Sequence, residues 1–205
     1  KTIKIWNMET GEVIRTLTGH NATINALLTN NDNELISGSG DLMIKIWNMT
    51  TGEEKRSLIG HSDGIWSLII NQNNELIAGS RGEIFIWNMT TGEIKRKLFA
   101  HFSLVYSLTI NKNNDLISSS NDYSIRIWNM EIGEVKKNLT DHSSSVWSVI
   151  VNDDNELISG SYDKTIKIWD METGQVKRTL TEHNGYIRSL GMNKNNEFAS
   201  GSSDN

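Results

Sequence analysis

Histidine, serine and aspartate recur along the chain in a fixed order, and these are the residue types of a hydrolytic triad. In such a triad the serine attacks a carbonyl carbon, the histidine takes its proton and the aspartate orients the imidazole. A triad is needed once, whereas here the histidines lie at positions 20, 61, 101, 142 and 183 within similar segments. The repetition favours a structural role, so we expect no enzyme activity, no catalytic residue and no cofactor.

Tryptophan repeats with nearly the same period and predicts the elements that carry these residues. Within Ile-Trp-Asn or Ile-Trp-Asp it occurs at positions 6, 47, 87, 128 and 169, at intervals of 41, 40, 41 and 41 residues. Each period holds four short apolar or alternating stretches, separated by turns rich in Asn and Gly. No stretch has sustained helical periodicity. Four strands in every period predict an all-β protein, a β-propeller of four-stranded antiparallel blades.

Short motifs in these periods are characteristic of one family. Gly-His occurs at Gly19-His20 and Gly60-His61, and Ala-His, Asp-His and Glu-His replace it in the other three repeats. Trp-Asp is complete at Trp169-Asp170 and is Trp-Asn elsewhere. With these motifs the whole chain resembles the WD-repeat (WD40) family.

Strand types a to d, named from the channel outward, divide the single domain 1–205 into blades. Four blades are expected at about 24–58, 65–98, 104–139 and 146–180. Strands a and b at 186–205 and strands c and d at 1–17 are complementary, because "SGSSDN" followed by "KTIKIW" matches "SGSYD" followed by "KTIKIW". Closing a fifth blade from both termini would bury two strand edges. The alternative is a fragment of a seven-bladed propeller, the commonest count in the family.

The resemblance implies a hydrogen-bonded set of four residues in a blade: the His before strand a, the Ser on b, the Asp of the b–c turn and the Trp on c. The sets are His20, Ser37, Asp41, Trp47; His101, Ser118, Asp122, Trp128; His142, Ser159, Asp163, Trp169; and His183, Ser200, Asp204, Trp6 across the closure. Such buried networks satisfy polar groups and fix register. Family geometry spreads the histidines around the rim, so no metal site is expected.

Blade two departs from this pattern. It keeps His61 and Trp87, but Ala78 replaces the serine, and Arg81-Gly82 shortens the b–c turn and removes the aspartate. We expect blade two either to be the least rigid or to use its turn for binding.

Composition bounds the classes of partner. The net charge is −5, with no basic stripe for nucleic acid, and no apolar run approaches the roughly 18 residues of a membrane span. Cysteine is absent and no signal peptide is visible, which favours an intracellular, cytoplasmic protein.

Residues that differ between repeats are the candidates for binding. The resemblance implies that two kinds of position face the top opening of the ring and contact partners. They are the positions flanking the start of strand a and the b–c turn residue just before the Asp of each four-residue set. Large or polar residues occupy these positions: Trp66, Tyr106, Trp147, Tyr186, Arg188, Tyr162, Arg81 and Asn25. Trp, Tyr and Arg are enriched at interface hot spots. The alternative is that the rings only fill the channel mouth.

The favoured function is therefore a non-catalytic protein–protein interaction scaffold that binds a peptide or protein segment on the top face. The net negative charge mildly favours a basic or apolar ligand. The alternative is a structural or assembly segment of a larger repeat array, because the repeats are very alike: compare "KTIKIWNMETGEVIRTLTGH" with "KTIKIWDMETGQVKRTLTEH". Similar repeats also permit oligomeric or domain-swapped closure.

Overall fold

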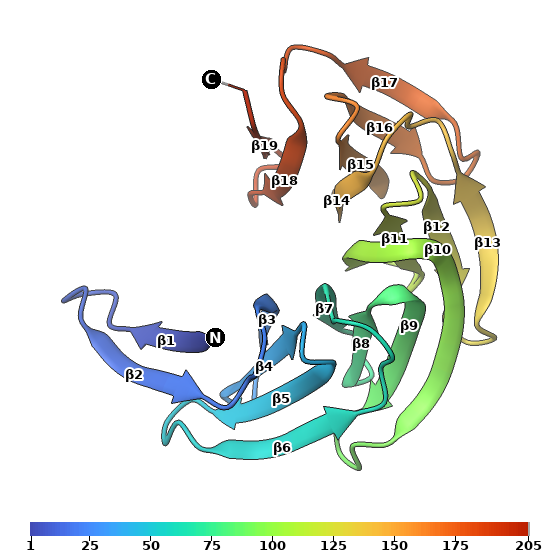
Figure 1. The fold of residues 1–205 in the computed structure, drawn as a ribbon. Helices are drawn as coiled ribbons and strands as arrows, with labels where there is room; N and C mark the ends of the chain where they lie inside the picture. Colours follow the sequence, from blue (N-terminus) through green and yellow to red (C-terminus); the bar gives the residue numbers. More distant parts are fainter. Residues whose placement is uncertain (205) are drawn as a thin grey trace.

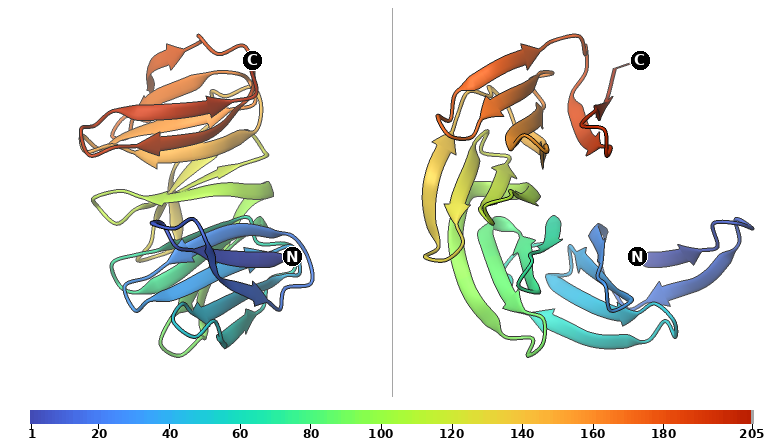
Figure 2. Two further views of the ribbon diagram at one scale, coloured as in Figure 1. Left: turned by 90° about the vertical axis from the view of Figure 1, so that its left-hand side faces the viewer. Right: turned by 180° about the vertical axis from the view of Figure 1, so that it is seen from behind.

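The fold is all-β. A computed structural model describes residues 1–204, and every regular element in that range is a strand (Figure 1). Strands consecutive in sequence pair antiparallel, and the resulting sheets stand side by side around an arc (Figures 1 and 2). This confirms the predicted all-β class and the antiparallel pairing of consecutive strands.

Two blades have the expected four strands in sequence order. The first contains β3 (Ile24–Thr29), β4 (Glu34–Ser39), β5 (Met43–Asn48) and β6 (Glu54–Ile59). The other contains β14 (Val146–Val151), β15 (Glu156–Ser161), β16 (Ile166–Asp170) and β17 (Val176–Leu180). In both, strand b is the most buried, because it lies between strands of its own blade and packs against neighbouring blades.

The two central blades are joined in one seven-stranded sheet, which the sequence did not predict. Its strands are β7 (Ser67–Ile70), β8 (Glu75–Gly79), β9 (Arg81–Asn88), β10 (Ile94–Ile110), β11 (Leu116–Ser120), β12 (Ile125–Asn129) and β13 (Glu134–Leu139). The expected break at 98–104 falls inside β10. The short turn is the cause: β9 begins already at Arg81, which pairs with Leu104 and keeps the connecting segment extended.

The termini form two separate half-blades, so the expected fifth blade is absent from this structure. β1 (Thr2–Trp6) pairs only with β2 (Val13–Thr18), and β18 (Ile187–Met192) pairs only with β19 (Phe198–Ser202). The two pairs face each other across an opening in the arc (Figures 1 and 2). No ladder joins β19 to β1, and Trp6 is 54% exposed.

Neighbouring blades pack through a repeated fit between glycine and a β-branched residue. A Cβ on Gly38 of β4 would lie 2.4 Å from Ile65 Cγ2, and one on Gly160 of β15 would lie 2.4 Å from Ile187 Cγ2. Both isoleucines are fully buried. At these two positions the glycine of strand b thus permits close approach of the next blade.

The turns between strands a and b adopt the geometry expected of asparagine. Asparagine takes a left-handed conformation more readily than other non-glycine residues. Here it does so once in every a–b turn, at Asn33, Asn74, Asn114, Asn155 and Asn196, with φ between 56° and 63°. This confirms the interpretation of the Asn-rich segments as turns.

Candidate functional site

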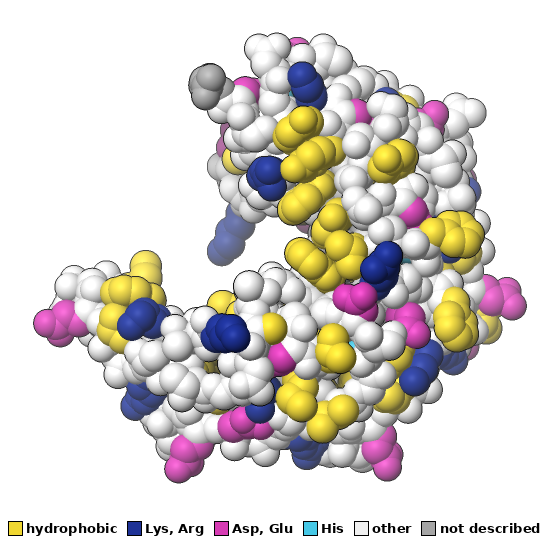
Figure 3. Space-filling model, viewed as in Figure 1, with side chains coloured by type: hydrophobic (Ala, Val, Ile, Leu, Met, Phe, Trp, Pro, Cys, Tyr) yellow, Lys and Arg dark blue, Asp and Glu magenta, His cyan; other side chains and the backbone are white. Residues whose placement is uncertain are grey.

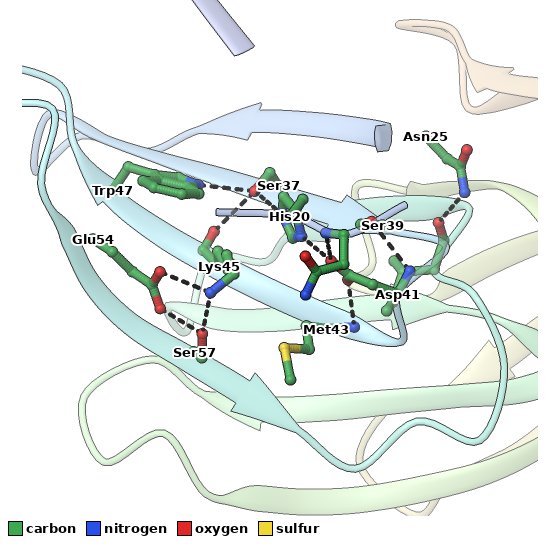
Figure 4. Close-up of polar contacts among 12 residues, drawn as sticks. His20, Asn25, Ser37, Ser39, Asp41, Met43, Lys45, Trp47, Glu54 and Ser57 are labelled. Carbon is green, nitrogen blue, oxygen red and sulfur yellow. Dashed lines mark hydrogen bonds and ion pairs between the residues drawn. The ribbon is translucent and has the colours of Figure 1, made fainter. Parts of the chain in front are cut away.

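The first complete blade shows how the recurring polar residues meet (Figure 4). His20 precedes β3, Ser37 lies on β4 and Trp47 on β5, with Asp41 in the turn between β4 and β5. His20 Nδ1 is 2.8 Å from Asp41 Oδ2 and its Nε2 is 2.7 Å from Ser37 Oγ. The Trp47 indole donates to the same Ser37 Oγ at 2.9 Å.

These contacts form one consistent chain of donors and acceptors. The indole N–H donates to the serine oxygen, the serine hydroxyl donates to Nε2, and Nδ1–H donates to the carboxylate. In this arrangement the Asp41 carboxylate is the final acceptor of the chain. Burial acts to raise the pKa of Asp41, but hydrogen bonds from the Asn21 amide and from His20 outweigh it and hold that pKa below its usual value. The network therefore stabilises a charged group at the top of the blade.

Two further blades repeat the arrangement. His101 and His142 contact Ser118 and Ser159 at 2.8 Å, and their Nδ1 atoms are 3.0 and 2.7 Å from Asp122 and Asp163. Trp128 and Trp169 donate to these serines at 2.9 and 2.8 Å. The serine hydroxyls resemble triad nucleophiles, but Ser37, Ser118 and Ser159 have no exposed surface. A substrate carbonyl cannot reach them in this arrangement.

The fourth set is incomplete in this structure. His183 contacts Asp204 and Ser200 at 2.7 Å each. Trp6, expected as its indole donor, lies on the other half-blade and is not brought to Ser200. The closure that would have joined them is absent.

Blade two has lost the centre of the network. Ala78 stands at the serine position, so His61 Nε2 and Trp87 Nε1 are buried without a hydrogen-bond partner. His61 Nδ1 contacts Ser80 Oγ at 3.1 Å instead of an aspartate, and its ring stacks on Phe85 at 4.1 Å. The distance between the ring centroids of His61 and Trp87 is still 6.1 Å, equal to that of His20 and Trp47. The two rings are therefore as far apart as in the blade that keeps its serine.

Replacing Ala78 with serine is expected to raise the free energy of unfolding by about 1–2 kcal/mol, because one hydroxyl would satisfy two buried atoms. The midpoint of urea unfolding measures this. Ala100→Ser is the matched control: Ala100 is equally buried, but His101 and Trp128 of its blade already share the Ser118 hydroxyl, so its new hydroxyl should destabilise. If both serines have the same effect, the site between His61 and Trp87 does not accept a bridging hydroxyl.

The candidate binding residues form a ladder of aromatic rings along the inner side of the arc, where hydrophobic side chains make a continuous run in Figure 3. Trp66 meets Tyr106 edge to face at 5.7 Å, and Tyr106 stacks on Trp147 at 4.4 Å. Tyr162 stacks on Trp147 at 5.4 Å and on Tyr186 at 3.9 Å. These five rings are called the aromatic ladder below. All are partly exposed, and Tyr186 is 39% exposed.

Hydrogen bonds position two members of the ladder. The Tyr106 hydroxyl lies 3.4 Å from Asn121 Oδ1, which also accepts from Ser145 Oγ at 2.7 Å. Burial, and to a lesser extent Tyr162, raises the pKa of Tyr106 above its usual value. Arg188 donates from Nη2 to the Tyr162 hydroxyl at 3.0 Å. The ladder is thus held by the turns and by strand a of neighbouring blades.

Two predicted site residues lie apart from these contacts. Asn25 donates to the carbonyl of Ile65 at 3.0 Å, which ties two blades together. Arg81 is 4.0 Å from Asp63 and has no stacking contact with the ladder rings. The structure brings together six of the eight predicted residues.

Sequence reasoning missed two exposed phenylalanines on β10. Phe99 is 84% exposed and Phe102 is 90% exposed. Phe102 follows the histidine, where the other repeats have Asn or Ser. This departure from the repeat was visible in the sequence, but the search for variable positions was confined to the start of strand a and the b–c turn.

Other kinds of site were sought in the described residues. Residues 1–204 contain no group of three or more His, Asp or Glu side chains placed to hold a metal ion. That range also contains no helix long and apolar enough to cross a membrane. The cavities on the face opposite the ladder recur between blades, at Asn73 and Lys95 and again at Asn113 and Lys136, and therefore follow the repeat.

Comparison with known proteins agrees with the geometry. The family model described as "WD domain, G-beta repeat" matches five times, at residues 11–48, 52–88, 92–129, 133–170 and 174–205. No curated protein matched the chain. The repeated His–Ser–Trp networks and antiparallel blades, together with these five matches across most of the chain, establish that the chain belongs to the WD-repeat family.

Proposed function

We propose that the chain is a non-catalytic interaction module that binds a peptide or protein segment on the face that carries the aromatic ladder. WD-repeat domains generally mediate protein–protein interaction. The observation that carries the proposal is the ladder itself: five partly exposed aromatic side chains from three blades and a half-blade, in mutual contact.

The ladder suits recognition because its shape is fixed before a partner arrives. Stacked rings lose little conformational freedom when they bind, which lowers the entropic cost of association. Aromatic side chains also supply large apolar contact area with a polar end. None of these residues repeats in every blade. A purely structural role in the repeat does not account for that variation.

The test is selection of random eight-residue peptides against the 205-residue chain. Peptides that bind should lose at least about tenfold in affinity with Trp66→Ala/Trp147→Ala, since truncation of a central aromatic hot spot costs about 2 kcal/mol or more. Circular dichroism should show that the double variant stays folded. The matched control is Phe99→Ala/Phe102→Ala, which removes two exposed rings elsewhere and should leave affinity unchanged. If the selected peptides bind both double variants as tightly as the parent chain, the site assignment is wrong.

A second candidate is an assembly segment within a larger repeat array. It is favoured by the exposed Trp6 and by the unpaired edges of β1 and β19. In a complete blade these two strands would be neighbours, as strands c and b. Light scattering separates these cases. Pairing of these edges between copies predicts a mass that is a multiple of 23.1 kDa, whereas a chain that acts alone stays at 23.1 kDa.

A further inference from the structure

The aromatic ladder carries one cationic group in an unusual setting. The Arg188 guanidinium lies 5.2 Å from the centroid of the Trp147 ring and 5.4 Å from that of Tyr162. Its hydrogen bond to the Tyr162 hydroxyl further fixes its position. The side chain belongs to an exposed residue of β18. The guanidinium is therefore held at the surface of the ladder.

This guanidinium has no acidic partner. No carboxylate of residues 1–204 lies within ion-pair distance of Arg188, whereas Arg81 on the same face has Asp63. The aspartates of the four-residue sets already have other hydrogen-bond partners. Asp163, which is the nearest of them in sequence to a ladder residue, accepts from His142 and from the amides of Ser143 and Thr165. A guanidinium has five N–H donors, and only one of them is used within residues 1–204.

The stacked rings add to this local positive character. Tyr106, Trp147 and Tyr162 stack with interplanar angles of 20° and 19°, so neighbouring rings cover part of one another's faces and their edges contribute more to the surface. The edge of an aromatic ring carries the positive part of its quadrupole. Edges and guanidinium together form a surface that favours an anion beside apolar groups, although the whole chain has a net charge of −5.

We propose that the ladder recognises an acidic peptide segment, in which a carboxylate binds Arg188 and an adjacent apolar residue packs on Tyr106 and Trp147. A carboxylate is the planar partner that a guanidinium binds through two parallel hydrogen bonds. The inference rests on the proposed function, because it names the ligand of the same face. It replaces the expectation from net charge of a basic or apolar ligand with one drawn from the local charge.

The experiment uses the peptides selected against the 205-residue chain. Asp or Glu beside an aromatic or aliphatic residue should be enriched. With Arg188→Gln the affinity of these peptides should fall about tenfold to a hundredfold, the range expected for hydrogen bonds to a charged group. Arg188→Lys should restore part of the loss, because it keeps the charge but not the bidentate geometry. Arg178→Gln, the same change on outer strand β17, is the control and should have no effect.

The two proposals fail in different ways. Neutral or basic peptides that depend on Trp66 and Trp147 but bind equally well to Arg188→Gln would overturn the acidic ligand and leave the binding face standing. No enrichment, or binding that survives Trp66→Ala/Trp147→Ala, would overturn the binding face and the acidic ligand with it. Acidic peptides that respond equally to Arg188→Gln and Arg178→Gln would show attraction by overall charge, which also contradicts the proposal.

Discussion

Replacing Ser159 with alanine is expected to lower the free energy of unfolding by about 3 kcal/mol. The Ser159 hydroxyl is the only contact of the His142 Nε2 atom and of the Trp169 indole N–H within the network. Both rings are buried. Each buried polar group left without a partner costs about 1–3 kcal/mol. Urea unfolding followed by tryptophan fluorescence measures the change.

Ser200→Ala provides a matched control in the C-terminal half-blade. Ser200 contacts His183 at 2.7 Å, close to the 2.8 Å between Ser159 and His142, but it receives no indole, and the His183 side chain is 29% exposed. Water can replace the lost hydroxyl there, so we expect a change of about 0.5 kcal/mol or less. Equal losses for Ser159→Ala and Ser200→Ala would show that burial of the doubly bonded serine does not determine stability.

The strand order within a blade could be predicted from the sequence because local patterns specify it. The a–b turns depend on asparagine, which tolerates positive φ, and the polar network depends on residues at fixed spacing. Ser37 and Trp47 are neighbours because β4 pairs with β5 in a register that places Leu35 opposite Trp47 and Ser37 opposite Lys45. These relations involve residues within one period. The same sequence pattern therefore recurs wherever the same local structure recurs.

Pairing between strands of different repeats was harder to predict. The extension of β10 through 98–104 depends on the pairing of Arg81 with Leu104, which arises from a missing segment rather than from any strand-forming residue. Closure of a fifth blade depends on the curvature summed over all the blades. Complementary strand types are necessary for such pairing but do not set that curvature, so the structure has two free half-blades instead.

The candidate site was predictable as a set of positions but not as a set of contacts. The position of Tyr162 in a turn gave no sign that its ring would lie between Trp147 and Tyr186. Asn25 occupies the position equivalent to Trp66, but its short amide reaches only the carbonyl of Ile65. Side-chain length and rotamer decide which variable positions meet, and the repeat pattern does not encode them.

Acidification from pH 7.5 to pH 5 is expected to destabilise the chain through His61. Burial, with a smaller effect from Lys97, lowers the pKa of His61 from 6.5 to about 4. Between those values the unfolded chain binds a proton that the folded chain does not, so stability falls as pH decreases. At about 1.4 kcal/mol per pH unit, the loss is about 2 kcal/mol at pH 5 and about 3 kcal/mol once the pH is below 4.

His61→Phe isolates this contribution, because it removes the titrating group and keeps a ring against Phe85. The variant should lose about 2 kcal/mol less than the parent chain between pH 7.5 and pH 5, as measured by urea unfolding at each pH.

Other titrating groups do not account for this difference. Burial also lowers the pKa of His101, but its ion pair with Asp122 opposes that shift, and its contribution is common to both proteins. Carboxylates such as Asp41, whose pKa values lie below their usual range, lose their contribution only at lower pH. Parallel pH profiles would mean that His61 is protonated without cost in the folded chain. The missing aspartate of blade two would then have no energetic consequence, although it is what distinguishes His61 from the three buried histidines that have a carboxylate partner.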